Sequence, residues 1–436
     1  MNIVYVGDNR NRLNYGCRAT STALSELLSV NNKIVGRIHG NFRNTDTRKI
    51  FYSPILGSYI YKFCARRKHW PIFKEVLIDI IHIRRKMKVS FTSNDFISMD
   101  FENSINKLLK CLPANDILKE CDLRQYDFDA LVVNGEGSFI FSQNPWRESL
   151  VEAMFMYWAK KMGKKVFFLN GMFSGSPNHE LNMSTISLMR PLFETIDLVG
   201  VREEQSLAFA KKYFPNATIA LYPDALFTWY KYINDGYSIN NGKYFIGMTG
   251  ATDESFVAYN FDQDYICISG SSSEQITKDR KFAIKTYCAL ICKLQKELKL
   301  KVIIVIPCEI DNFLLEVGKI TNSPIITVDT PVLAAGKILA NARVYITGRY
   351  HPSILASLGG TPCVFMNSNS HKNMSLQQTL EYDNPHEYNS IPTEDEINKI
   401  IYEAKSLISK GNLLRAKIRN RSVVLSKEAE KMSALF

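Results

Sequence analysis

Short runs rich in β-branched and aliphatic residues alternate with longer helix-patterned stretches along most of the chain, and this alternation constrains the fold more than any other feature. Stretches such as RESLVEAMFMYWAKKM and EEQSLAFAKKYF carry apolar residues at helical spacing. The runs between them predict strands in IVYV, ALVVN, KVFFLN, LVGV and IALY, at residues 3–6, 130–134, 165–170, 198–201 and 219–222. Strand and helix in alternation predict a parallel sheet covered by helices on both faces.

The alternation pauses at FTWYKYINDGYSINNGKY, residues 227–244, a polar and aromatic stretch that we interpret as a linker. Beyond it the pattern restarts, with helical stretches such as KTYCALICKLQKEL and TPVLAAGKILANA. Further strands are predicted in YFIGM, YICIS, KVIIVIP, PIITV, VYIT and PCVFM. Because 436 residues exceed what one hydrophobic core usually supports, we predict two Rossmann-like domains, at residues 1–230 and 243–392.

The last segment, residues 393–436, opens with a Thr-x-x-Glu capping box formed by Thr393 and Glu396, and continues as a basic and apolar helix. An α/β chain with two doubly wound domains and a closing C-terminal helix has the GT-B-like architecture. Ligands of such folds bind in the cleft at the carboxyl ends of the strands. We expect the acceptor to bind the N-terminal domain and the donor to bind the C-terminal domain.

Composition points to an ordinary globular protein, with 46% hydrophobic and 22% charged residues. Nine cysteines without a CxxC pair argue against a complete set of disulfides and favour a reducing compartment. The start, MNIVYVGDNR, is interpreted as a first strand rather than a signal peptide. No apolar run approaches the ~20 residues that a membrane span needs, so a cytoplasmic location is expected.

Much of the net charge of +11 lies in residues 41–90, which we interpret as an insertion with twelve Lys and Arg against three Asp and Glu, or 12 − 3 = +9. Basic clusters interleaved with aromatic and aliphatic residues suit an anionic membrane surface, such as the inner face of the plasma membrane. Two alternatives stay open, a strip that follows phosphates and an amphipathic insertion that packs on its own domain. The sequence has no recognisable nucleic-acid module, so no nucleic-acid partner is expected.

Four blocks in order along the chain resemble the polysaccharide pyruvyl transferase family. They are NYGCRATSTAL, VVNGEGSF, VGVREEQS followed by YPDALF, and ITGRYHPSILASLGGTPCVF. The similarity extends from about residue 1 to residue 380, with NGEGS where the family more often has a run of glycines. The resemblance implies a GT-B-like fold and transfer of a pyruvyl group from phosphoenolpyruvate to sugar hydroxyls, which forms a ketal. It implies phosphoenolpyruvate as a donor substrate and no cofactor.

Three arginines fall at the starts of predicted helices, where the helix dipole disfavours a cation by up to ~1 kcal/mol. They are Arg18, Arg202 after LVGV, and Arg349 ahead of the first-turn proline Pro352. Their position makes sense if a multiply charged anion such as phosphoenolpyruvate gathers there. The alternative for each is a salt bridge to a carboxylate such as Glu203 or Asp224.

Histidine side chains supply the candidate proton carriers. His351 shares a turn with Arg349 and follows the strand VYIT, so it can hold phosphate or move a proton near neutral pH. We expect both residues at a solvent-facing turn. The alternative for His351 is a helix-capping or core role. His371 and Lys372 follow the strand PCVFM and are expected to contact phosphate or acceptor, although either can equally be structural.

Two loops at strand ends complete the predicted site. In NGEGS, Gly135 and Gly137 allow backbone to approach a ligand, and Glu136 is a candidate acid or base or simply a turn-stabilising residue. NGMFSGS lines the acceptor side, and Asp224 either moves protons or makes an interdomain hydrogen bond. No metal is predicted, because the His, Cys and Asp positions lack ligand spacing. The predicted substrate contacts are Asn14, Arg18, Gly135, Gly137, Ser138, Asn170, Gly171, Ser353, His371 and Lys372.

The predicted mechanism begins with protonation of the methylene carbon of phosphoenolpyruvate, followed by attack of one sugar hydroxyl, loss of phosphate and closure by a second hydroxyl. Arg202, Arg349 and His351 would stabilise the developing charge, and Glu136, Asp224 or His351 would move the protons. The expected partner is a sugar or lipid-linked glycan acceptor. Two alternatives stay open: a nucleotide-sugar glycosyltransferase of the same architecture, and a non-catalytic binding module on a membrane-bound assembly.

Overall fold

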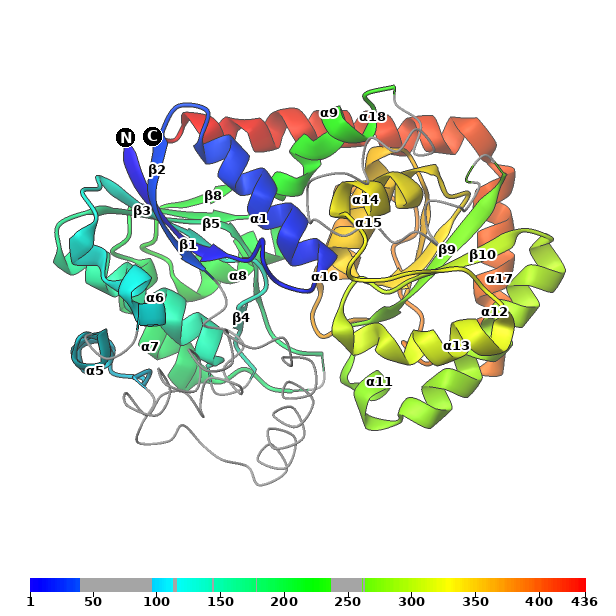
Figure 1. The fold of residues 1–436 in the computed structure, drawn as a ribbon, viewed down its shortest axis with the longest axis horizontal. Coiled ribbons are helices and arrows are strands. Elements are labelled where there is room, and N and C mark those ends of the chain that lie inside the picture. Colours follow the sequence, from blue (N-terminus) through cyan, green and yellow to red (C-terminus); the bar gives the residue numbers. More distant parts are fainter. Residues whose placement is uncertain (40–95, 113–115, 143–144, 178, 237–260, 262) are drawn as a thin grey trace.

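The computed structural model describes residues 1–39, 96–112, 116–142, 145–177, 179–236, 261 and 263–436. The basic insertion predicted at 41–90 and the strand predicted at 244–248 lie outside these residues, as do residues 237–242 of the predicted domain boundary. Two α/β halves lie side by side, and the C-terminal helix runs along one edge of both (Figure 1).

A six-stranded sheet forms the N-terminal half, and all of its pairings are parallel. Its order is β2-β1-β3-β5-β7-β8, so the chain reverses direction across the sheet at β1 and β3. The strands are β1 Asn2–Asp8, β2 Lys33–His39, β3 Ala130–Asn134, β5 Lys165–Gly171, β7 Leu198–Val201 and β8 Ile219–Leu221. The helices are α1 Tyr15–Leu28, α5 Phe101–Cys111, α6 Arg147–Lys161, α7 Met183–Phe193 and α8 Glu204–Tyr213.

Two features of this half were not predicted from the sequence. Strand β2 has the sequence KIVGRIH, in which Gly36 and Arg37 interrupt the apolar run, so it lacks the continuous pattern of its neighbours. A short pair, β4 Phe139–Ile140 and β6 Phe173–Ser174, forms beyond the ends of β3 and β5.

The C-terminal half contains a five-stranded parallel sheet in the order β11-β10-β9-β12-β13, with its reversal between β9 and β12. Its strands are β9 Tyr265–Ser271, β10 Lys301–Val305, β11 Ile325–Ile326, β12 Tyr345–Gly348 and β13 Cys363–Phe365. The helices are α11 Glu274–Lys278, α12 Arg280–Leu298, α13 Leu314–Thr321, α14 Val332–Asn341, α15 Tyr350–Leu358 and α16 Lys372–Thr379. Both halves are therefore doubly wound, as the alternating pattern predicted.

The C-terminal segment forms two helices rather than one, α17 Glu394–Ser409 and α18 Gly411–Glu430. The capping box between Thr393 and Glu396 is present. Gly411 has a φ of 56°, a left-handed conformation that favours glycine, and the chain turns at this point. Helix α18 then runs back to the N-terminal half, where the ring of the last residue, Phe436, packs on Phe167 at a centroid distance of 4.6 Å.

The stretch interpreted as a linker is helical over much of its described part. Residues Ala225–Trp229 form a 3₁₀ helix, η5, and Tyr230–Ile233 form the short helix α9. Trp229 is fully buried in a hydrophobic cluster that contains residues of both sheets. The stretch begins after β8, the last strand of the first sheet, and its aromatic residues supply core that the two halves share.

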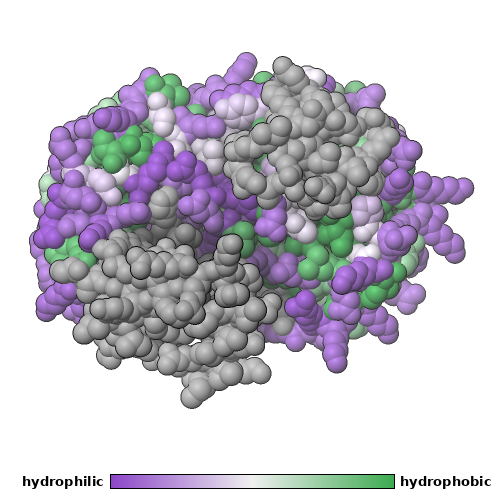
Figure 2. Space-filling view, in the orientation of Figure 1, coloured by the Kyte–Doolittle hydropathy of each residue, from purple (hydrophilic) through white to green (hydrophobic). Residues whose placement is uncertain are grey.

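Both sheets direct the carboxyl ends of their strands to the boundary between the halves. In doubly wound folds, ligands bind beside the strand pair where the order reverses. The loops after β1 and β3 in one half, and after β9 and β12 in the other, lie at these reversals. The surface on the face drawn in Figure 2 is mostly hydrophilic, including the region between the halves. No helix in the described part of the chain is both long and apolar enough to cross a bilayer.

Candidate active site

A cavity of about 230 Å³ lies between the halves, where loops from both sheets meet. Residues from the N-terminal half make one wall, and residues from the loop after β10, from the start of α15 and from the start of α16 make the other. Eight of the fifteen residues predicted as site residues line it, namely Asn14, Glu136, Gly137, Ser138, Arg202, Arg349, His351 and Lys372. Two motifs far apart in the sequence, NGEGS and GRYHPS, therefore face one space.

A three-residue cluster joins the halves behind this cavity. Asp224 is fully buried, and its Oδ2 accepts from Nη1 of Arg202 at 3.0 Å and contacts Nε2 of His351 at 3.2 Å. Burial alone would raise the pKa of this carboxyl. The charge and hydrogen bond of His351 and the charge of Arg202 outweigh burial and hold the pKa of Asp224 well below its usual value. Asp224 is thus an ionised interdomain acceptor, which is one of the two roles predicted for it.

The ionised Asp224 also determines how His351 is used. Nε2 of His351 lies 3.2 Å from Oδ2 of Asp224 and 3.2 Å from Nη1 of Arg202, which itself donates to Asp224. In the neutral tautomer that donates to Asp224, Nε2 carries the proton and Nδ1 carries the lone pair. Gly16, in the first turn of α1, lies against the same ring, and a Cβ at this position would be 2.5 Å from Nδ1. Any side chain at position 16 would collide with the imidazole ring of His351, which explains the glycine in the block NYGCRATSTAL.

The guanidinium of Arg202 is held at one edge by Asp224 and on one face by Tyr350. It pairs with Asp224, and its charge lies 4.3 Å from the ring centroid of Tyr350. A cation over an aromatic face is attracted by the ring quadrupole, by about 2 kcal/mol when desolvated. The salt bridge named as the alternative for Arg202 is therefore present, and the arginine still lines the cavity.

Arg349 is buried, contrary to the expected solvent-facing turn. Its Nε and Nη2 donate to Asp311 at 2.9 and 2.6 Å in a two-bond fork, and Asp311 is fully buried. Gly270 makes room for this carboxylate, since a Cβ there would lie 2.2 Å from its Oδ1. The expectation failed because the counter-ion comes from the 3₁₀ helix Glu309–Phe313, an element that the sequence pattern did not indicate.

Glu136 occupies a left-handed backbone position, with a φ of 36°, at the end of β3. Its Oε1 accepts from Nδ2 of Asn9 at 2.6 Å and from Nδ2 of Asn134 at 3.0 Å. Ser21 donates to the same oxygen at 3.2 Å. Three donors converge on this one oxygen, so Glu136 is positioned as an acceptor at the cavity wall.

A family model described as polysaccharide pyruvyl transferase matches residues 36–370. The chain belongs to the polysaccharide pyruvyl transferase family. The match confirms the resemblance drawn from the four sequence blocks, and it makes this protein a transferase. A search of curated proteins gave no match.

Solved structures confirm the GT-B fold of this pyruvyl transferase family member. UDP-GlcNAc 2-epimerase from Methanocaldococcus jannaschii has a TM-score of 0.52 at 13% identity, with 100% of this chain and 99% of that one covered. The Rickettsia bellii UDP-N-acetylglucosamine 2-epimerase has a TM-score of 0.52 at 10% identity, covering 100% and 96%. Arabidopsis thaliana UGT89C1, complexed with UDP-L-rhamnose, reaches 0.50 at 11% identity, covering 100% and 99%. At such identities the likeness concerns the fold.

Seven residues predicted as site residues of this pyruvyl transferase lie outside the cavity wall. Several of them make contacts that stabilise the fold. Gly135 and Gly171 both pack against Phe168, where a Cβ would lie 2.1 and 2.0 Å from its ring atoms. Asn170 accepts from the backbone of Ala225 at 2.9 Å. The others are Arg18, Asp224, Ser353 and His371.

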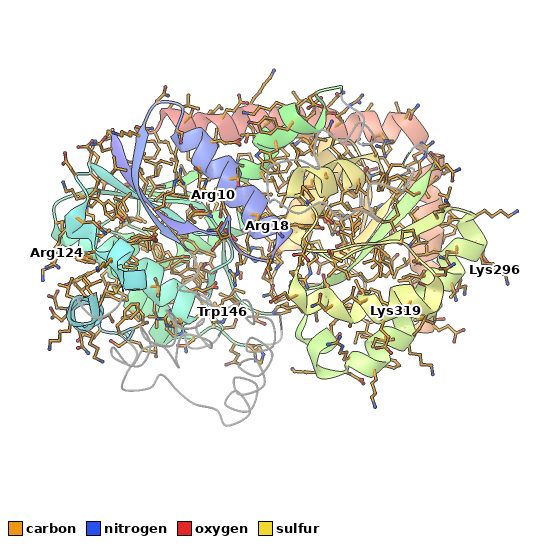
Figure 3. The ribbon with its side chains drawn as sticks, in the orientation of Figure 1. Arg10, Arg18, Arg124, Trp146, Lys296 and Lys319 are labelled. Atoms are coloured by element: carbon orange, nitrogen blue, oxygen red, sulfur yellow. The ribbon has the colours of Figure 1, made fainter. Side chains whose placement is uncertain are left out.

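The side chains of Arg18 and Ser353 donate hydrogen bonds to backbone carbonyls and do not line the cavity. The guanidinium of Arg18 donates to the carbonyl of Val328, and the hydroxyl of neighbouring Tyr15 donates to the carbonyl of Thr327. Figure 3 places Arg18 where α1 meets the C-terminal half. Ser353 is fully buried and donates to the carbonyl of Arg349 at 2.7 Å. The first turn of α1 thus fastens the two halves together.

His371 and Lys372 are adjacent but have different surroundings. Nε2 of His371 contacts Oε1 of Glu203 at 3.0 Å, a second link between the halves. Lys372 lines the cavity, and its Nζ donates to Oδ1 of Asn369 at 2.7 Å. Burial, with the positive charges of Arg349 and Arg202, lowers the pKa of Lys372 to about 7.

Sequence reasoning missed several residues of the cavity wall. Arg12 pairs with Glu148 at 3.1 Å, and both line the cavity together with Trp146, which Figure 3 labels. Arg12 follows β1 and Asn369 follows β13, so both occupy strand ends, the same signal that identified Glu136 and His351. The described residues hold no group of three or more His, Cys, Asp and Glu that could bind a metal ion.

Proposed function

We propose that this pyruvyl transferase moves the pyruvyl group of phosphoenolpyruvate onto two hydroxyls of a sugar and forms a cyclic ketal. The acceptor sugar belongs to a cell-surface polysaccharide or to its lipid-linked precursor. One observation carries the proposal: cationic side chains from both halves, with His351, line a single cavity at the strand reversals of both sheets. A small trianionic donor and a neutral sugar suit such a cavity.

The chemistry balances without a cofactor. A proton adds to the methylene carbon of phosphoenolpyruvate, and the first hydroxyl oxygen bonds to the adjacent carbon and gives up its proton. The bond from that carbon to the phosphate oxygen then breaks, and the second hydroxyl oxygen takes the vacant position. One hydroxyl proton replaces the proton given to carbon, and the other leaves with phosphate.

The arginines suit the binding of the donor. Arg202 and Arg349 are each fixed by a buried carboxylate, so their orientation is set before an anion arrives. Preorganised donors stabilise developing charge without reorganising during the reaction. In the described part of the chain, Nη1 of Arg349 has no protein partner that would compete with a carboxylate or phosphate oxygen.

His351 suits the removal of the hydroxyl proton. Its Nε2 is bound to Asp224, so Nδ1 carries the lone pair that can accept a proton, and Asp224 stabilises the imidazolium that results. Asp224 itself stays ionised behind the cavity wall and is proposed as the positioning residue. The earlier choice among Glu136, Asp224 and His351 is thereby narrowed to His351 for this step.

The competing proposal is a glycosyltransferase that grips the diphosphate of a nucleotide sugar with the same side chains. It is favoured by the shared fold of the nucleotide-sugar epimerases and of UGT89C1. A non-catalytic binding module is the third possibility, and it gives no role to the paired groups of the cavity.

The first prediction separates these functions. Purified protein incubated with phosphoenolpyruvate should be stabilised against thermal unfolding, by about 2.7 kcal/mol when the ligand is at 100 times its dissociation constant. With a panel of sugar acceptors, it should release inorganic phosphate and form a product heavier by one pyruvyl ketal, measured by mass spectrometry. Stabilisation by nucleotide sugars alone, with no phosphate release, would replace pyruvyl transfer by the glycosyltransferase proposal.

The second prediction concerns membrane attachment through residues 41–90, which lie outside the described residues. Because this segment carries a charge balance of +9, the protein should sediment with anionic vesicles, and less so as salt shortens the Debye length to ~3 Å at 1 M. Replacing six basic residues with Gln should abolish sedimentation and spare activity on a soluble acceptor. The six are Arg66, Arg67, Lys68, Arg84, Arg85 and Lys86.

Equal sedimentation of wild type and variant would contradict membrane attachment. Loss of soluble activity in a variant with an unchanged melting temperature would instead place the segment beside the anionic substrate.

A further inference from the structure

The reaction proposed above needs a proton donor to carbon, and most ionisable groups of the cavity are unsuited to this step. Asp224 is ionised and lies behind the wall, and Glu136 accepts from three donors through one oxygen. Nε2 of His351 is bound to Asp224. The guanidinium groups of Arg202 and Arg349 do not lose protons in proteins.

Lys372 is placed differently. It is the first residue of α16, directly after the loop from β13, and its half-buried side chain lines the cavity opposite the N-terminal wall. Asn369 accepts one of the three N–H groups of its ammonium. Lys372 is not within salt-bridge distance of a carboxylate in the described part of the chain, unlike Arg202 and Arg349. The remaining N–H groups are available to a ligand.

The surroundings of Lys372 lower the pKa of its ammonium group. Arg349, on the end of β12, and Arg202, on the end of β7, are both cations, and with burial they lower the pKa of Lys372 to about 7. Cys17 on α1 and Cys308 after β10 also face it, and burial raises the pKa of the Cys308 thiol. A lysine in such surroundings gives up a proton near neutral pH.

One carboxyl group, that of Glu387, interacts electrostatically with Lys372. Burial raises the pKa of Glu387 to about 7, although the positive charges of Lys372 and His371 lower it. It does not belong to the cavity wall. Glu387 is therefore a neighbour of Lys372 that does not line the cavity.

We infer that Lys372 is the general acid of the reaction and donates a proton from Nζ to the methylene carbon of phosphoenolpyruvate. This inference rests on the proposed function. The N–H bond breaks as the C–H bond forms, and the electron pair of the double bond makes the new bond. The adjacent carbon becomes electrophilic, and the first sugar hydroxyl attacks it while His351 takes the hydroxyl proton. The neutral amine of Lys372 regains a proton from water.

The experiment compares Lys372→Arg and Lys372→Ala with wild type. The control variant is Lys319→Ala, because Lys319 lies on α13 in the same half and does not line the cavity (Figure 3). Arginine keeps the charge and cannot release a proton, so kcat should fall by about 100-fold or more, while the KM for phosphoenolpyruvate changes little. Lys319→Ala should match wild type. Melting temperatures of all variants report whether they fold.

Chemical rescue tests the proton itself. Propylammonium ions should restore part of the kcat of Lys372→Ala, whereas tetramethylammonium, a cation without an N–H group, should not. A site that needs only positive charge would respond to both ions. Equal rescue by both would overturn the inference.

The pH dependence has a defined sign. The donor must be protonated, so the wild-type kcat/KM should fall as pH rises through about 7, and this limb should be absent from the residual activity of Lys372→Arg. Bound donor adds negative charge beside the ammonium and raises its pKa, so the same limb in kcat should lie at higher pH. An unchanged kcat in Lys372→Arg, with only KM altered, would show that Lys372 holds charge and overturn the inference alone. Absence of ketal formation by wild type would overturn the proposed function as well.

Discussion

His351→Ala is expected to lower kcat for pyruvyl transfer by a factor of about 10² to 10⁴, the range typical for loss of a general base. His371→Ala is the matched control. Each histidine comes from the C-terminal half, contacts a buried carboxylate of the N-terminal half, and begins or precedes a helix. Only His351 lines the cavity. His371→Ala should therefore keep kcat within a few-fold of wild type.

The measurement is steady-state phosphate release with saturating phosphoenolpyruvate, together with the unfolding midpoint of each variant in urea. Similar midpoints with a large difference in kcat would separate chemistry from the loss of an interdomain contact. If both variants lost activity equally, the two histidines would matter only as links between the halves, and another residue would have to accept the hydroxyl proton.

Asp224→Asn refines this assignment. An asparagine of the same shape can present its amide nitrogen to His351 and disfavour the tautomer that has its lone pair on Nδ1. In the proposed reaction Asp224 would act only through the two residues that it contacts, His351 and Arg202. This explains why a side chain outside the cavity occurs in one of the blocks that carried the family resemblance.

Strands and motif positions could be predicted from the sequence because they depend on local patterns. Buried parallel strands are continuous apolar runs, and LVGV matched β7 at both ends. Polar residues directly after such runs fall at the same edge of the sheet, which is why GRYHPS and NGEGS were assigned to one site. Strand β2 was not predicted because its burial is uneven and its apolar run is broken by Gly36 and Arg37.

Pairings between distant residues could not be predicted. Asp224 and His351 are 127 residues apart, and Arg349 and Asp311 are 38 apart, so neither pair follows from periodicity. The sequence indicated that cations at helix starts need anions. It could not distinguish a substrate from a buried carboxylate, and the structure supplies a carboxylate for both Arg202 and Arg349.

The stretch interpreted as a linker shows a similar limit of sequence patterns. Asn and Gly usually mark connections, and residues 234–242 contain several of them. The aromatic residues just before them pack into the core that the two halves share. A pattern of polar residues identifies where the chain turns, but not whether the turns are buried by a second sheet.

Arg349→Ala is expected to reduce stability as well as activity, because Arg349 is buried and does not lie at the solvent-facing turn that the sequence predicted. The fork from Arg349 compensates the charge of Asp311, which is fully buried. Removing one partner of a buried pair leaves an uncompensated charge and costs about 3 to 5 kcal/mol. Arg349→Lys should be intermediate, since an ammonium cannot make the two parallel bonds of the guanidinium. Urea unfolding measures the loss.

A double variant separates the two roles of Arg349. In Arg349→Met/Asp311→Leu, both charges are replaced by apolar side chains, and such replacements are often neutral or stabilising. The double variant should therefore recover most of the free energy of unfolding lost in Arg349→Ala, yet stay inactive because no guanidinium faces the donor. Recovery of activity together with stability would mean that Arg349 serves only the fold. An unfolding midpoint for Arg349→Ala equal to wild type would mean that Asp311 finds its compensation elsewhere.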